Sequence, residues 1–63
     1  MEYSNYESFK AWASANHWFE VMFSSDDESN LSNHYFLTPA GTLVQVIEGE
    51  GEVISLIYQN RVD

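Results

Sequence analysis

The sequence predicts an α+β fold, in which one short N-terminal helix precedes a four-stranded antiparallel sheet with a β-meander in its C-terminal half. Three observations predict this fold: helical spacing of apolar residues near the N-terminus, an alternating stretch after it, and two glycine-ended turns farther on. The expected strands cover about residues 17–24, 32–38, 42–48 and 52–59. The 63 residues are expected to form a single small domain, residues 1–63, because a chain of this length supports one hydrophobic core at most.

The helix is expected over about residues 5–15. Ser4 and Glu7 stand three positions apart, as the two members of a capping box do at the start of a helix. One apolar stripe follows from the three- and four-residue spacing of Tyr6, Phe9, Trp12 and Ala13. Asn16 is expected to end the helix in the left-handed conformation.

The first strand is expected to have one strongly apolar face. Alternation places Phe19, Val21 and Phe23 on that face and Trp18, Glu20 and Met22 on the opposite one. The polar residues Ser24 to Asn30 then predict a surface loop. The sequence leaves open which edge of the meander this strand occupies.

The two glycine-ended turns predict the pairing of the last three strands. Residues 39–41 suit a three-residue hairpin loop whose final glycine is left-handed, and we expect the same loop at residues 49–51. A two-residue second loop would separate polar from apolar side chains less well, so the three-residue register is preferred. The predicted pairs are Leu37 with Leu43, Phe36 with Val44, His34 with Val46, Glu48 with Glu52, Val46 with Ile54, Val44 with Leu56 and Thr42 with Tyr58.

In this register both faces of the sheet are substantially apolar. The face expected to pack on the helix, with His34 towards one end, holds Phe36, Val44, Val46, Ile54, Leu56 and Tyr58. The predicted oligomer interface is the other face, formed by Leu37, Leu43, Gln45, Ile47, Val53, Ser55 and Ile57. Because a single short helix covers only one face, we expect another copy of the chain to cover the second. A sheet that curls into a half-barrel and a partner of different sequence are the alternatives.

The charge and composition exclude several functional classes. Ten acidic residues against two basic ones give a formal charge of −8, which argues against direct binding to nucleic acid and to anionic membrane surfaces. A basic protein partner stays possible. The chain has no cysteine, which excludes disulfides, zinc–thiolate sites and thiol nucleophiles. Without a signal sequence or the roughly 18 apolar residues of a membrane span, a cytoplasmic location is expected.

Two groups of acids form the predicted acidic surface: Asp26, Asp27 and Glu28 in the loop, and Glu48, Glu50 and Glu52 at the second hairpin. Glu48 and Glu52, directly opposite in the predicted register, would repel each other, and the proton affinity of one would rise. A hard cation could relieve this repulsion, but no coordinating loop of defined spacing is present, so no metal site is predicted.

His17 and His34 are the two histidines of the chain. They could approach each other if the first strand pairs with the second, and a neighbouring glutamate would then make a general base or a metal pair conceivable. Neither histidine belongs to a spaced motif, so ordinary positions at a helix end and in a sheet are favoured. No catalytic residue and no cofactor are predicted.

The sequence therefore does not determine the function. Its best interpretation is a small acidic, non-catalytic protein–protein interaction or regulatory module that acts as a homo-oligomer, with a dimer favoured. One alternative is an acidic inhibitor whose carboxylates imitate nucleic-acid phosphates and occupy the basic cleft of a nucleic-acid-binding protein. The other is a protein that binds a small ligand or a divalent metal, with weak catalysis at a subunit interface.

Overall fold

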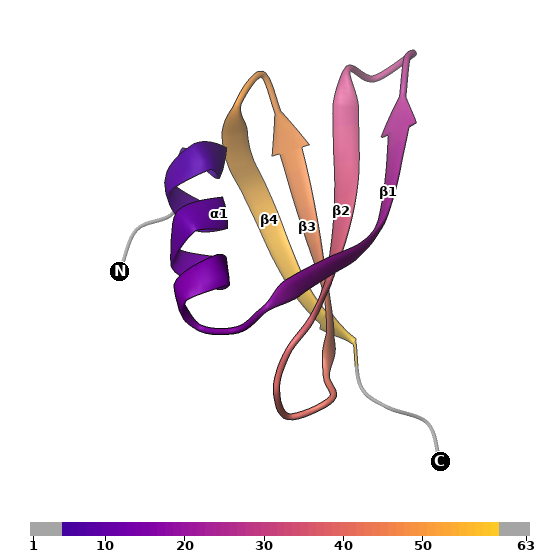
Figure 1. The fold of residues 1–63 in the computed structure, drawn as a ribbon. Coiled ribbons are helices and arrows are strands. Elements are labelled where there is room, and N and C mark those ends of the chain that lie inside the picture. The colour runs from indigo at the N-terminus through magenta and orange to yellow at the C-terminus, as the bar shows by residue number, and fades with distance from the viewer. Residues whose placement is uncertain (1–4, 60–63) are drawn as a thin grey trace.

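The computed structural model describes residues 5–59, which form one helix and four strands. Their bounds are α1 (Tyr6–Ala15), β1 (Phe19–Asp26), β2 (Leu31–Leu37), β3 (Leu43–Gly49) and β4 (Glu52–Gln59). Each strand pairs antiparallel with the next, in the order β1-β2-β3-β4, and α1 lies against one face of the sheet on the side of β4 (Figure 1). The predicted α+β fold is confirmed, and β1 extends the meander by pairing with β2.

The start of α1 is attached to the turn between β3 and β4. Asn5 caps the helix, since its Oδ1 accepts a hydrogen bond of 3.0 Å from the N–H of Ser8. The N–H of Tyr6 donates to the carbonyl oxygen of Gly51 at 2.9 Å. The predicted cap at Ser4 lies outside the described residues. These two contacts fix where the helix begins over the sheet.

The left-handed residue after α1 lies one position later than expected. Asn16 has φ −102°, and its N–H still bonds to the carbonyls of the last turn. Its side chain donates to the carbonyl oxygen of Trp12 at 2.8 Å. The left-handed residue is His17, with φ 65°, so the prediction for Asn16 is wrong. Asn16 acts as a cap through its side chain instead.

A β-bulge in β1 breaks the predicted alternation. The pairing shifts between Glu20 and Met22, so Phe19 and Met22 lie on one face of the sheet and Glu20 and Phe23 on the other. The strand also continues to Asp26, beyond the predicted start of the loop. Only residues 27–30 form the turn between β1 and β2, with Asn30 left-handed at φ 59°.

The second hairpin has a different register from the predicted one. Its turn is the two-residue pair Glu50 and Gly51, both with positive φ (54° and 80°), as in a type I′ turn. Ile54 is then an extra residue in a bulge, and Val53 turns towards the core. The observed pairs are Gly49 with Glu52, Glu48 with Val53, Ile47 with Ser55, Val46 with Leu56 and Val44 with Tyr58.

Gly49 is therefore a strand residue rather than a loop residue, and its lack of a side chain is what this register requires. A Cβ at Gly49 would lie 2.7 Å from the terminal methyl of Ile54 and 2.9 Å from a methyl of Leu31. The first hairpin, in contrast, has the predicted register, with Gly41 left-handed at φ 85°.

The core lies between α1 and one face of the sheet. Its buried apolar residues are Tyr6, Phe9, Ala13, Phe36, Val44 and Val46, with Trp12, Trp18, Val53 and Leu56 partly buried around them. The ring of Phe9 meets that of Phe36 edge to face at 5.4 Å, a favourable aromatic geometry. The helix therefore covers the predicted face, except that Ile54 is 58% exposed and has left it.

Candidate functional site

The sheet face that α1 leaves uncovered, here called the open face, carries large apolar side chains in contact with solvent. Phe19, Met22, Leu37, Ile54 and Ile57 are each more than two-fifths exposed. The neighbouring apolar residues Leu31, Tyr35, Leu43 and Ile47 are half-buried, and no helix or strand of residues 5–59 lies over them. An exposed apolar surface of this kind is typical of an interaction site.

Six of the seven residues of the predicted interface lie on this open face. They are Leu37, Leu43, Gln45, Ile47, Ser55 and Ile57. Val53 does not, because the two-residue turn sets it opposite Glu48 on the helix-covered side, where it packs against the core. The prediction of its face is wrong, and Ile54 takes its place on the open face. That these residues form an interface stays a prediction.

A row of side-chain amides crosses the open face. Gln45 Nε2 on β3 donates to Asn33 Oδ1 on β2 at 2.9 Å, and Gln59 Nε2 on β4 donates to Gln45 Oε1 at 3.1 Å. We call these three residues the amide ladder. It runs diagonally, because Asn33 pairs with Ile47 and Gln59 with Leu43, one register step to either side of Gln45.

The amide ladder divides the apolar surface of the open face into two patches. Patch one, towards the β2–β3 turn, contains Phe19, Met22, Tyr35, Leu37 and Leu43. Patch two, towards the β3–β4 turn, contains Leu31, Ile47, Ile54 and Ile57. The open face is thus apolar on both sides of a polar strip.

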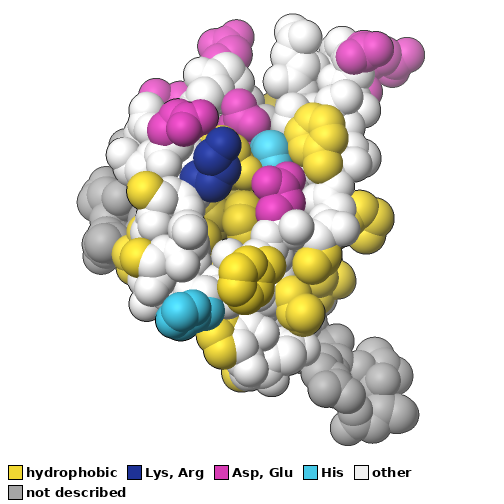
Figure 2. Space-filling model, viewed as in Figure 1, with side chains coloured by type: hydrophobic (Ala, Val, Ile, Leu, Met, Phe, Trp, Pro, Cys, Tyr) yellow, Lys and Arg dark blue, Asp and Glu magenta, His cyan; other side chains and the backbone are white. Residues whose placement is uncertain are grey.

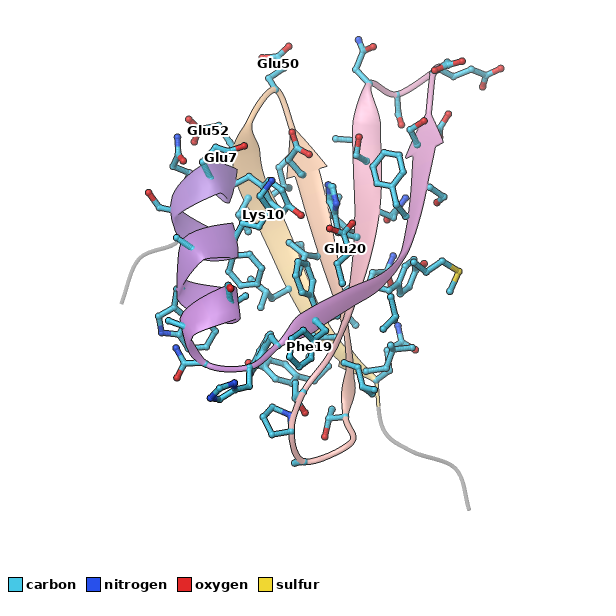
Figure 3. All side chains as sticks on the ribbon, in the orientation of Figure 1. Glu7, Lys10, Phe19, Glu20, Glu50 and Glu52 are labelled. Atoms are coloured by element: carbon cyan, nitrogen blue, oxygen red, sulfur yellow. The ribbon has the colours of Figure 1, made fainter. Side chains whose placement is uncertain are left out.

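Charge is concentrated away from this surface. Between the register rows of Leu43 and Ile47, no described residue of the open face is charged. Figure 3 shows Glu50 at the tip of the β3–β4 turn, with Glu7 and Glu52 near the same end. Five predicted surface acids, Asp26, Asp27, Glu28, Glu50 and Glu52, are exposed. Figure 2 shows most acidic side chains towards the end of the molecule that holds the β1–β2 and β3–β4 turns.

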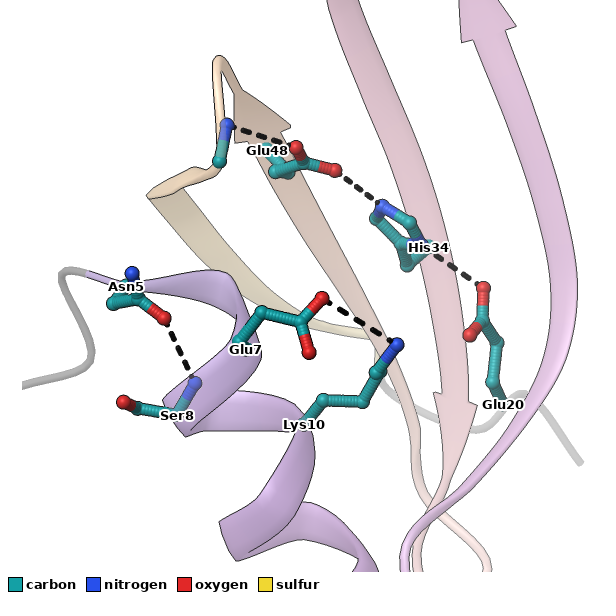
Figure 4. Close-up of polar contacts among 8 residues, drawn as sticks. Asn5, Glu7, Ser8, Lys10, Glu20, His34 and Glu48 are labelled. Carbon is teal, nitrogen blue, oxygen red and sulfur yellow. Dashed lines mark hydrogen bonds and ion pairs between the residues drawn. The ribbon is translucent and has the colours of Figure 1, made fainter.

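The helix-covered side contains a buried histidine held between two carboxylates. His34 is 7% exposed, its Nδ1 lies 2.9 Å from Glu20 Oε2, and its Nε2 lies 2.9 Å from Glu48 Oε1 (Figure 4). The Tyr6 ring stacks on the imidazole at 4.3 Å. With both nitrogens engaged, His34 joins β1, β2 and β3 and has no free nitrogen for base catalysis.

This arrangement changes the expected behaviour of Glu48. The hydrogen bond from His34 lowers the pKa of Glu48, and the N–H of Gly51, at 3.0 Å, acts in the same direction against the effect of burial. Glu48 pairs with Val53 rather than with Glu52, so the predicted repulsion between the two glutamates is wrong. Glu48 is a structural partner of His34 and is not part of the exposed acidic surface.

Tyr6 contributes a stacked aromatic ring to this cluster rather than a hydrogen bond. Its hydroxyl is buried and has no hydrogen-bond partner in the described part of the chain. Burial is the main cause that raises the pKa of Tyr6, and the charges of Glu20 and Glu48 act in the same direction. The phenol therefore stays protonated and packs on the imidazole.

The geometry does not assemble the histidine pair that the sequence made conceivable. His17 is exposed at the end of α1, whereas the hydrogen-bond partners of His34 are Glu20 and Glu48. Within residues 5–59, no group of three or more His, Asp or Glu side chains is arranged to hold a metal ion.

A shallow hollow lies between the β1–β2 and β3–β4 turns. Its volume is about 260 Å³, and its walls are Ser29, Asn30, Leu31, Gly49, Glu50 and Ile54. Ligand pockets commonly measure about 300–1,000 Å³ and enclose most of the ligand. This hollow is smaller and open, and it borders patch two of the open face.

Three polar residues of these arrangements were not predicted: Glu20, Asn33 and Gln59. Asn33 was within reach, because the correctly predicted first hairpin sets it one diagonal step from Gln45. Glu20 and Gln59 were not, because the pairing of each follows from a bulge, at Val21 in β1 and at Ile54 in β4. A bulge has no strong signal in a sequence without glycine at that position.

No helix among residues 5–59 has the length and the apolar character that a membrane crossing requires. Comparison with protein-family models, curated proteins and solved structures found nothing that matches the chain.

Proposed function

We propose that the protein is a small, non-catalytic protein–protein interaction module that acts as a homo-oligomer, with a dimer favoured, through the open face. The observation that supports this most is the contrast within one sheet. One face packs a buried core against α1, with Phe23 and Tyr58 exposed at its margins, whereas the other exposes large apolar side chains and has no described element over it. Covering such a surface is favourable by roughly 25 cal/mol for each Å² removed from water.

The charge distribution favours a second copy over a basic partner on this face. The molecule carries −8 in total, yet the middle of the open face is uncharged among the described residues. Two copies can therefore meet there while their carboxylates stay apart in solvent. A basic partner would be attracted to the acidic turns instead.

The size of the chain argues in the same direction. Among residues 5–59, the buried apolar core consists of six residues in one layer between α1 and the sheet. A second layer, made by a symmetric copy, would enlarge the apolar core that a small chain can form. The absence of cysteine from the chain agrees with the proposed cytoplasmic location, where thiols stay reduced.

The other two hypotheses receive less support from the geometry. Glu20 and Glu48 point to His34, so they are not available to imitate phosphates for a nucleic-acid-binding protein. The nitrogens of His34 are both occupied, which leaves little for a catalytic or metal-binding role. We therefore retain the interaction module as the proposed function.

Light scattering coupled to size-exclusion chromatography tests the proposal. Wild-type protein at tens of micromolar should be a dimer or larger, and salt should preserve the assembly, because apolar contacts are not screened while the repulsion between acidic molecules is. Ile57→Glu should dissociate it by placing a charge in patch two. Ala11→Glu, which adds the same charge at an exposed position of α1, is the matched control and should leave the assembly intact. A monomeric wild type would exclude the proposed function.

A further inference from the structure

The amide ladder has two different ends, and this asymmetry limits how two copies can meet. At one end, Asn33 accepts from Gln45 through Oδ1, which leaves its Nδ2 as a donor. At the other, Gln59 donates to Gln45 through Nε2, which leaves its Oε1 as an acceptor. Neither of these two free atoms has a hydrogen-bond partner among the described residues. The ladder therefore runs from a donor end to an acceptor end.

Two symmetric orientations bring the ladder of one copy onto the ladder of the other. A two-fold axis along the ladder sets Asn33 against Asn33, so donors face donors and acceptors face acceptors. A two-fold axis that crosses the ladder at its middle residue, Gln45, makes the ladders antiparallel. Asn33 of each copy then faces Gln59 of the other, and both free ends find a partner of the opposite kind.

We infer that the partner seated on the open face is a second copy of this chain, with the two amide ladders antiparallel and Gln45 of one copy facing Gln45 of the other. This inference rests on the proposed function and specifies the geometry of that same interface. In this orientation patch one packs on patch one and patch two on patch two, so apolar surface meets apolar surface throughout. The uncharged middle of the open face places no acidic residue across from another there.

The physical reason for this orientation is the cost of covering polar groups without partners. An amide removed from water without a hydrogen bond destabilises a complex by about 1–3 kcal/mol on protein scales. The apolar patches alone would allow two copies to pack in several relative positions. The free amide groups at both ends of the ladder find hydrogen-bond partners in one of these positions. A single polar residue in an apolar interface specifies register in coiled coils for the same reason.

Charge exchange at the central position tests the inference. Gln45→Glu and Gln45→Lys, each alone, should be folded monomers, because each homodimer would place two like charges against each other on the axis. An equimolar mixture should form a one-to-one heterodimer, since the glutamate of one copy then faces the lysine of the other. Native mass spectrometry identifies the heterodimer by its mass, and far-UV circular dichroism checks that each variant is folded.

The same exchange at Ile57 is the matched control. Ile57 lies off the proposed axis and would face Ile47 of the other copy, so Ile57→Glu mixed with Ile57→Lys should not reassemble. The inference is wrong if the wild type is a dimer but the Gln45 mixture stays monomeric, or if the Ile57 mixture reassembles as well. A monomeric wild type would instead remove the proposed function.

A measurement on the unaltered protein provides a second test that does not depend on the folding of variants. In a mixture of isotope-labelled and unlabelled wild type, isotope-filtered NOEs should connect the side-chain amide of Asn33 in one copy with Gln59 in the other. NOEs between Asn33 and Asn33 would overturn the antiparallel arrangement. An interface whose NOEs involve neither residue would overturn it as well.

Discussion

The two faces of this sheet differ in how the polar side chains within an apolar surface are hydrogen-bonded. On the helix-covered face, one imidazole joins two carboxylates, and these polar groups find their partners inside the chain. On the open face, three neutral amides bond in a row and leave one donor and one acceptor free. Groups satisfied within the chain stabilise the fold, whereas groups left unsatisfied at a surface are available to a partner.

This comparison predicts that substitutions on the covered face change folding and those on the open face change association. Phe9→Ala should have the largest effect, a loss of about 3–5 kcal/mol in the free energy of unfolding, because it empties the centre of the only core in the described chain. Ile57→Ala, measured by the same urea titration at concentrations where the protein is monomeric, should cost far less. Comparable losses would mean that the two faces do not differ in the way described.

His34→Leu should have the next largest effect. The leucine still packs under the Tyr6 ring, but Glu20 and Glu48 lose the partner that they share. Removing one partner from a buried ion pair costs about 3–5 kcal/mol. The loss should be smaller here, because both glutamates are partly exposed. Thermal melting measures the loss. Adding Glu20→Gln and Glu48→Gln to the same protein should recover most of it. If the triple variant melts as low as His34→Leu alone, loss of packing rather than charge explains the effect.

Acid should weaken the same cluster through Glu48. Because the folded state lowers the pKa of Glu48 from its ordinary value of 4.5, its contribution is complete above that value and disappears as the pH falls through the lower folded value. The free energy of unfolding of wild type should therefore decrease below about pH 4.5 more steeply than that of Glu48→Gln. Glu50→Gln, which removes an exposed carboxylate of the adjacent turn, should keep the wild-type slope. Equal slopes for all three proteins would exclude this role of Glu48.

The smallest effect is expected at the start of the helix. Asn5→Ala removes the acceptor for the N–H of Ser8 and should cost about 1 kcal/mol in the free energy of unfolding. Since Asn5 caps α1 and is not one of the open-face residues, the association constant measured by sedimentation equilibrium should not change. A weaker association in this variant would show that the helix start contributes to the interface.

The sequence allowed prediction of the helix, the strands and the first hairpin, because each depends on local signals: apolar periodicity and a turn that ends in Gly41. The second hairpin was predicted with the wrong register because residues 49–51 suit two turn types. Choosing between them depends on contacts distant in sequence, namely the space that Leu31 and Ile54 require at Gly49. Local turn chemistry cannot contain that information.

The candidate site was predictable to the same extent. Six of the seven residues predicted for the open face lie there, since beyond the bulge the register error is two positions, which keeps each side chain on its face. The shorter turn and the bulge exchanged the faces of Val53 and Ile54. The partners of His34 were not predicted, because Glu20 reaches it through the bulge in β1 and Glu48 was assigned to Glu52. Pairing errors therefore affected individual contacts more than the division into two faces.

Solvent contact at the two faces tests the central claim most directly. A soluble paramagnetic probe, applied to methyl-labelled protein at high concentration, should leave the Leu37, Leu43 and Ile57 methyls nearly as protected as those of Val44. On dilution, the three open-face residues alone should become accessible while Val44 stays protected. Methyls of Leu37 and Ile57 that are fully relaxed by the probe at every concentration would contradict the account, since the open face would then have no partner.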